Sequence, residues 1–181
     1  MRVAFFLIFS TLYIIPVISQ SPNEILEEYL LDCFYQKEPA VNVSEHMNQC
    51  MTGKTYPFYA FKDLQGSCYD SNYNSDDYVV LSYSKENCSR CEQELSFLKN
   101  QKFNKAQLKI FLISEMKTRE VNHAHLKHVL YGDADFIYKN QYGYPLTILL
   151  GPCNKIIGFY FRGVSYSMDT QNDFINKVRS N

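Results

Sequence analysis

The stretch that decides the fold is Tyr78-Val79-Val80-Leu81-Ser82-Tyr83-Ser84, which is followed closely by Cys88-Ser89-Arg90-Cys91. Its β-branched and aromatic residues are typical of a buried strand. The residues after the second cysteine, 92–100, have the spacing of a helix. The sequence therefore predicts a strand that leads into a CxxC pair at a helix start, where two thiols are placed for thiol–disulfide chemistry.

Residues 1–19 predict a secretory signal peptide, because Arg2 precedes an almost continuous apolar run and Ser19 suits a cleavage site. An uncleaved membrane anchor is the alternative. The run is near the lower limit of about 17–25 residues for a spanning helix, and Pro16 interrupts it. No other segment is apolar enough to span a membrane, and the chain ends without a KDEL-type tail. We therefore expect a secreted, extracellular protein that enters through the endoplasmic reticulum.

Cleavage would leave about 162 residues, which fits one domain with a full core. The formal net charge is −1 for the whole chain and becomes −2 without Arg2. This near-neutral charge gives no footprint for nucleic acid and no polybasic membrane patch.

Six cysteines lie after the predicted leader, and an even number in an oxidising compartment indicates disulfides. If Cys88 and Cys91 pair, the other four allow three connectivities; they are Cys33, Cys50, Cys68 and Cys153. Asn42 begins a glycosylation sequon in a polar stretch. A second sequon at Asn87 overlaps the CxxC pair, and we expect it to stay bare if the site is catalytic.

The first part of the mature chain, 20–75, predicts a helix from Ser21 that ends before Pro39. Residues 38–55 are polar and read as a loop. The aromatic run 56–61 predicts a short strand at a sheet edge because it contains a proline. Residues 63–77 read as a further loop.

The second part predicts alternating elements. The expected strands are 78–84, 108–113, 146–150 and 155–161, and the expected helices are 88–100, 121–131 and 169–178. The order is β-α-β-α-β-β-α. A β-α-β crossover places two strands in parallel, and the later hairpin adds antiparallel strands.

This order resembles the thioredoxin-like superfamily, whose active-site pair matches Cys88 and Cys91 and whose cis-proline loop matches Gly143-Tyr144-Pro145. The resemblance implies an α/β, thioredoxin-like three-layer fold with a mixed sheet in residues 76–181. Residues 20–75 would then be an N-terminal helical extension. It also implies a cis peptide bond before Pro145.

Within the superfamily the chain is most similar to the N-terminal domain of selenoprotein P. The residues that carry this resemblance are Cys88-Ser89-Arg90-Cys91, His125-Leu126-Lys127 and Cys153-Asn154-Lys155-Ile156-Ile157. Cys88 stands at that family's selenocysteine position. The family's long tail, rich in cysteine and histidine, is missing, so delivery of selenium is not implied.

Cys88 is the expected nucleophile, because backbone N–H groups at a helix start and the nearby Arg90 stabilise a thiolate. Cys91 would then resolve the mixed disulfide. The resemblance implies that Tyr144 and Pro145, with Arg90, contact the substrate. The expected partners are protein thiols or disulfides, or small thiols such as glutathione, and no cofactor is expected.

Two alternatives stay open. The pair is an inert disulfide in a secreted binding module that uses its aromatic N-terminal segment, or Cys88 reduces peroxide. The first is favoured by two departures from the superfamily: Asn87 stands where a tryptophan is usual, and Ser82 stands where a buried acid is usual.

No metal site is expected, since a single CxxC lacks a second pair of ligands at usable spacing. Glu92 follows the pair where haem attachment would need histidine. Of the three neighbouring histidines, only His125 and His128 would share a helix face, which we expect to be solvated.

The implied fold also predicts the other disulfides. The third strand runs antiparallel to strand 78–84, so Cys153 after one and Cys68 before the other would meet at the pole opposite the active site. The expected pairs are Cys68–Cys153 and, by elimination, Cys33–Cys50.

Overall fold

The computed structural model describes residues 22–36, 42–57, 60–63, 68–70, 78–85, 87–100, 108–114, 126–130 and 144–180. The predicted leader, residues 1–19, lies outside these ranges. Within them, no helix combines the length and the apolar character that crossing a membrane requires.

In the described part of the chain, seven strands form one mixed sheet in the order β2-β1-β5-β4-β3-β6-β7. They are β1 (Ala60–Asp63), β2 (Cys68–Asp70), β3 (Tyr78–Ser84), β4 (Leu108–Ser114), β5 (Leu126–Leu130), β6 (Leu146–Gly151) and β7 (Lys155–Phe161). Strands β3, β4 and β5 are parallel, and the remaining pairs are antiparallel. The predicted mixed α/β sheet is confirmed, and β3, the strand before the CxxC pair, lies inside it.

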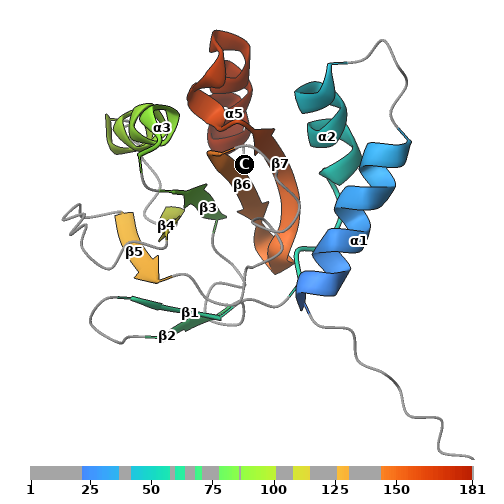
Figure 1. Ribbon diagram of the computed structural model, residues 1–181, viewed down its shortest axis with the longest axis horizontal. Coiled ribbons are helices and arrows are strands. Elements are labelled where there is room, and N and C mark those ends of the chain that lie inside the picture. The colour runs from blue at the N-terminus through green and yellow to red at the C-terminus, as the bar shows by residue number, and fades with distance from the viewer. Residues whose placement is uncertain are drawn as a thin grey trace, which may run out of the picture.

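Helices cover both faces of this sheet. They are α1 (Pro22–Tyr35), α2 (Val43–Met51), α3 (Ser89–Asn100) and α5 (Met168–Ser180), with short 3₁₀ turns η1 (Pro152–Asn154) and η2 (Val164–Tyr166). Figure 1 shows α1 and α2 together on one side of β6 and β7, and α3 on the other. Because side chains alternate along a strand, Leu81 packs with α1 and α2, whereas Val80 packs with α3 and α5.

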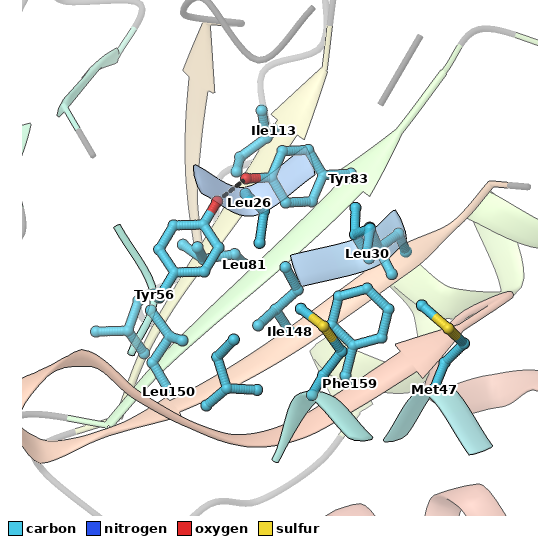
Figure 2. Close-up of a cluster of buried hydrophobic side chains, with 14 of the residues drawn as sticks. Leu26, Leu30, Met47, Tyr56, Leu81, Tyr83, Ile113, Ile148, Leu150 and Phe159 are labelled. Carbon is cyan, nitrogen blue, oxygen red and sulfur yellow. Dashed lines mark hydrogen bonds between the residues drawn. The ribbon is translucent and has the colours of Figure 1, made fainter. Parts of the chain in front are cut away.

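The core under α1 and α2 contains one buried polar pair. The hydroxyls of Tyr56 and Tyr83 lie 2.7 Å apart and are hydrogen-bonded, as the dashed line in Figure 2 marks. Leu26 of α1 and Leu81 of β3 surround the pair (Figure 2). A buried tyrosine usually finds such a partner, so two large rings enter this core without an unsatisfied hydroxyl there.

Helix α2 corrects the expectation that residues 38–55 are a loop. Asn42 caps the helix, because its Oδ1 accepts a hydrogen bond from the backbone N–H of Ser44. Met47 and Met51, one turn apart, bury one face against the core. The segment is polar on its outer side only, and its helical conformation depends on that packing.

Strand β5 corrects the predicted helix 121–131. Leu126–Leu130 pairs in parallel with β4, with Ile110 opposite Leu126. The periodicity of a short apolar run does not distinguish a strand from a helix. Here the edge of β4 is open to pairing, and this favours the strand. His128 therefore lies on a strand, while His123 and His125 lie outside the described residues.

The first part of the chain contributes to the same sheet. Strand β1 begins at Ala60, after Pro57, and lies between β2 and β5, so the edge position predicted for residues 56–61 is wrong. Strand β2 falls within the predicted loop 63–77. Residues 20–75 thus provide two helices and two strands that complete the core and the sheet.

Candidate functional site

The CxxC pair lies at the N-terminus of α3, directly after β3. Asn87 adopts a left-handed conformation, with φ of 54°, and turns the chain into the helix. The carbonyl of Cys88 accepts a hydrogen bond from the N–H of Glu92, so Cys88 precedes the first helical residue as its cap. The N–H of Cys91 donates to the Sγ of Cys88 at 3.1 Å. The backbone N–H of Cys91, at the start of the helix, therefore points at the sulfur of Cys88.

The structure contains the predicted Cys88–Cys91 disulfide, with the two Cα atoms 5.2 Å apart. The two cysteines differ in exposure: Cys88 is half-buried, whereas Cys91 is 5% exposed. A substrate thiolate or disulfide that comes from solvent therefore reaches Cys88 before Cys91.

The predicted proline loop lies at the same edge of the sheet. The Tyr144–Pro145 peptide bond is cis, as expected. Because Tyr83 of β3 is opposite Leu146 of β6, Pro145 stands beside the carboxyl end of β3, from which the CxxC turn departs. The Nζ of Lys85 lies 5.5 Å from the centre of the Tyr144 ring. The sequence-predicted residues Tyr144 and Pro145 are thus brought to the end of the strand that leads to the cysteines.

Glu94 is a site residue that the sequence reasoning missed. It is 1% exposed and lies on α3, one turn beyond Cys91. Its carboxylate accepts hydrogen bonds from the Thr147 hydroxyl at 2.6 Å and from the N–H groups of Val164 and Ser165 at 2.9 and 2.7 Å. This acid joins α3 to β6 and η2, and so fixes the cysteine-bearing helix.

A sequence signal for Glu94 existed. Cys91, Glu94 and Leu98 follow one another at helical spacing and share the buried face of α3. A charged residue on an apolar stripe is rarely buried without partners. On β3, Ser82 is hydrogen-bonded with Thr147, so Thr147 connects Ser82 with Glu94.

Gly163 keeps this region close-packed, and its replacement by alanine is expected to lower the free energy of unfolding by about 2 kcal/mol. Its φ is +83°, and an added Cβ would lie 2.7 Å from the Cγ of Pro145 and 2.8 Å from the Oε2 of Glu94. Gly53→Ala is the matched control, since Gly53 has φ of +89° with open space around a Cβ. The control should lose about 1 kcal/mol in urea unfolding; equal losses would show that crowding at Gly163 does not matter.

Of the two disulfides predicted for the remaining four cysteines, the structure contains one. Cys33–Cys50 is a disulfide, as expected, with Cα atoms 5.7 Å apart. The predicted Cys68–Cys153 disulfide is wrong, because both are free, exposed thiols. Cys68 lies on β2 at one edge of the sheet, and Cys153 follows β6 near the other. Five strand spacings separate β2 from β6, about 24 Å, against the 4.4–6.8 Å between Cα atoms that a disulfide needs.

A groove of about 660 Å³ runs along the β7 edge between α2 and α5. Its polar lining centres on Asp173, which accepts a hydrogen bond from Tyr160 at 2.9 Å and pairs with Lys177 at 2.8 Å. Burial, and secondly the Asp173 charge, raises the pKa of Tyr160 well above its usual range. The Tyr160 hydroxyl therefore stays a donor. Tyr166 of η2 also lines the groove.

No protein-family model and no curated protein sequence matches the chain. Solved structures do match. The thioredoxin domain of a thiol-disulfide oxidoreductase from Bacteroides vulgatus is 24% identical, with a TM-score of 0.51, over 69% of this chain and 98% of that one. A thiol:disulfide interchange protein from Bacteroides sp. is 23% identical, with a TM-score of 0.53, over 72% and 91%.

A thioredoxin-like protein from Porphyromonas gingivalis is 19% identical, with a TM-score of 0.52, over 70% of this chain and 93% of its own. At such identities the similarity concerns the fold. The chain has the thioredoxin-like fold predicted from its CxxC strand, helix and proline loop.

Proposed function

We propose that the protein is a thiol–disulfide oxidoreductase that acts through Cys88 and Cys91. The observation that carries the proposal is the hydrogen bond from the Cys91 N–H to the Cys88 Sγ, 3.1 Å long, at the start of α3. A donor aimed at a sulfur stabilises its thiolate more than its thiol. The positive end of the helix acts in the same direction.

The reaction moves two electrons. In the reduced protein, the Cys88 thiolate attacks one sulfur of a substrate disulfide, forms a mixed disulfide and expels the first substrate thiolate. The Cys91 thiolate then attacks the Cys88 sulfur, which re-forms the Cys88–Cys91 bond and expels the second substrate thiolate. The protein is oxidised and the substrate is reduced; the reverse sequence oxidises a substrate dithiol.

The difference in burial supports the division of roles. Half-buried Cys88 meets the substrate, and Cys91, at 5% exposure, meets only the Cys88 sulfur of the mixed disulfide. Tyr144 and Pro145 border the site at the end of β3 and would form the edge against which a substrate chain docks. Arg90, between the cysteines, is exposed and available to the same substrate.

Trapping tests the proposal. The free thiols Cys68 and Cys153 should first be changed to serine, because they are exposed and would form mixed disulfides of their own. In that background, Cys91→Ser is expected to accumulate a stable mixed disulfide with oxidised glutathione or insulin on Cys88. Cys88→Ser should accumulate much less, because Cys91 is buried. The parent should accelerate the reduction of insulin by dithiothreitol; no trapped species and no acceleration would refute the proposal.

A binding module with an inert cystine is the second candidate function. The groove between α2 and α5 favours it, since about 660 Å³ is in the range of ligand sites. Insulin turnover separates the two, because an inert cystine does not accelerate the reduction of insulin by dithiothreitol, whereas a cycling pair does.

Several finer predictions accompany the proposal. They are secretion after removal of residues 1–19, a thioredoxin-like domain that begins near residue 76, and similarity to the N-terminal domain of selenoprotein P with Cys88 at the selenocysteine position. Glycosylation at Asn42 is compatible with its role as the α2 cap, since the capping bond uses Oδ1 and not the amide nitrogen. Intact mass before and after deglycosylation would test it.

A further inference from the structure

Three cationic side chains lie at the edge of the sheet where the CxxC turn leaves β3. Tyr83, Leu146 and Phe161 are aligned across β3, β6 and β7, so these strands share one edge at this point. Lys85 follows β3 there, and Arg162 follows β7. Arg90 stands between the two cysteines. We call Lys85, Arg90 and Arg162 the cationic rim.

Aromatic rings hold each member of the cationic rim. The Arg90 and Arg162 guanidinium carbons lie 5.9 and 5.4 Å from the centre of the Tyr166 ring, and Lys85 lies over Tyr144. Arg162 also donates to the Tyr166 hydroxyl at 3.1 Å. Cation–π contacts fix the position of a charge without neutralising it.

The charges of the rim are not neutralised by carboxylates within the described part of the chain. None of the three cations forms an ion pair there. Glu94 is buried and already accepts three hydrogen bonds. The exposed carboxylates of Glu92 and Asp169 lie on the neighbouring helix starts, and Glu92 has an interaction of its own.

We propose that the cationic rim selects disulfides that carry a carboxylate close to the reacting sulfurs. The inference rests on the proposed function and names its substrate class. As a substrate sulfur approaches Cys88, its neighbouring carboxylate meets Arg90 and Arg162, which form no ion pair with a carboxylate of the described residues. Tyr166, 45% exposed, and Met168, 76% exposed, offer apolar surface beside them, which suits a polypeptide substrate.

The test compares disulfides of different charge in the Cys68→Ser/Cys153→Ser background. Oxidation of the reduced protein is followed with dithiodipropionate (anionic), hydroxyethyl disulfide (neutral) and cystamine (cationic). Each rate constant is divided by that of the same disulfide with mercaptoethanol. The normalised anionic-to-cationic ratio does not depend on the thiolate fraction of Cys88, so it reports the charges around Cys88, and the rim variants measure the share of the rim.

The parent ratio should exceed one, and Arg90→Gln/Arg162→Gln should lower it about fivefold at low ionic strength. The matched control Lys99→Gln/Arg179→Gln removes two charges from the far ends of α3 and α5 and should change it less than about 1.5-fold. About 1 M salt, with a Debye length near 3 Å, should bring the parent ratio close to one.

A second arm uses two peptide disulfides, one flanked by acidic residues and one by lysines. A charge preference larger than that of the small disulfides identifies a polypeptide substrate; a preference confined to the small disulfides identifies a small anionic one. Equal reaction with all disulfides would overturn the inference alone. No reaction of Cys88 with any of them would overturn the proposed function and the inference with it.

Discussion

Replacing Glu94 with alanine is expected to lower the free energy of unfolding by about 4 kcal/mol. The carboxylate is 1% exposed and accepts three hydrogen bonds from β6 and η2. Alanine would leave the N–H groups of Val164 and Ser165 without this acceptor, and each buried unsatisfied donor costs about 1–3 kcal/mol. Glu94→Gln keeps one acceptor oxygen but turns an amide toward a donor, so about 2 kcal/mol should be lost.

Urea unfolding at neutral pH measures both effects. Glu92→Ala is the matched control, because it removes the same charge from an exposed position on the same helix. It should lose at most about 1 kcal/mol. A loss for Glu94→Ala no larger than that of the control would show that the carboxylate does not bind η2 to α3. Since η2 carries Tyr166 and α3 carries both cysteines, the same bonds also hold the cationic rim beside the disulfide.

The elements that the sequence predicted well are those whose signals are local. Strand 78–84 appears as β3 and strand 155–161 as β7 with the same bounds, and the helix after the CxxC pair appears as α3. Each has a continuous apolar or periodic pattern that is buried on the predicted faces. The proline loop was predictable from the family resemblance, because its place before a strand can be recognised without the tertiary structure.

The elements that the sequence missed depend on partners distant in the chain. Helix α2 is short and its outer face is polar, but Asn48 accepts a hydrogen bond from the N–H of Phe159 on β7. Strand β5 exists because the outer edge of β4 is open to parallel pairing. Neither interaction leaves a signal in a window of neighbouring residues.

The site shows the same limit. Cys88, Cys91 and Pro145 carry recognisable motifs, whereas Glu94 acquires its role from bonds to two segments more than fifty positions away. Cys68 was misplaced because it precedes β3 in sequence. In space, β1, β5 and β4 lie between its strand and β3. Two segments that are neighbours in the sequence lie side by side in the sheet only where no other strand is inserted between them.

Removing the Cys33–Cys50 disulfide is expected to lower the free energy of unfolding by about 3 kcal/mol, which corresponds to about 6–12 °C in melting temperature for a domain of this size. The bond links α1 to α2 across a sequence separation of 17. It lets His46 of α2 keep a 2.7 Å hydrogen bond to the Cys33 carbonyl. Unfolding of Cys33→Ala/Cys50→Ala, followed in urea by circular dichroism under oxidising conditions, measures the loss.

Cys88→Ala/Cys91→Ala removes the same number of cysteines and one disulfide, but its sequence separation is 3. Closing so short a loop restrains the unfolded chain less, so this control should lose about 1 kcal/mol less. The same ordering is expected from the proposed function, since a cystine that is repeatedly opened should contribute less to the fold than the one that anchors α1. A larger loss for the CxxC variant would assign that pair a structural role and would weaken the case for its cycling.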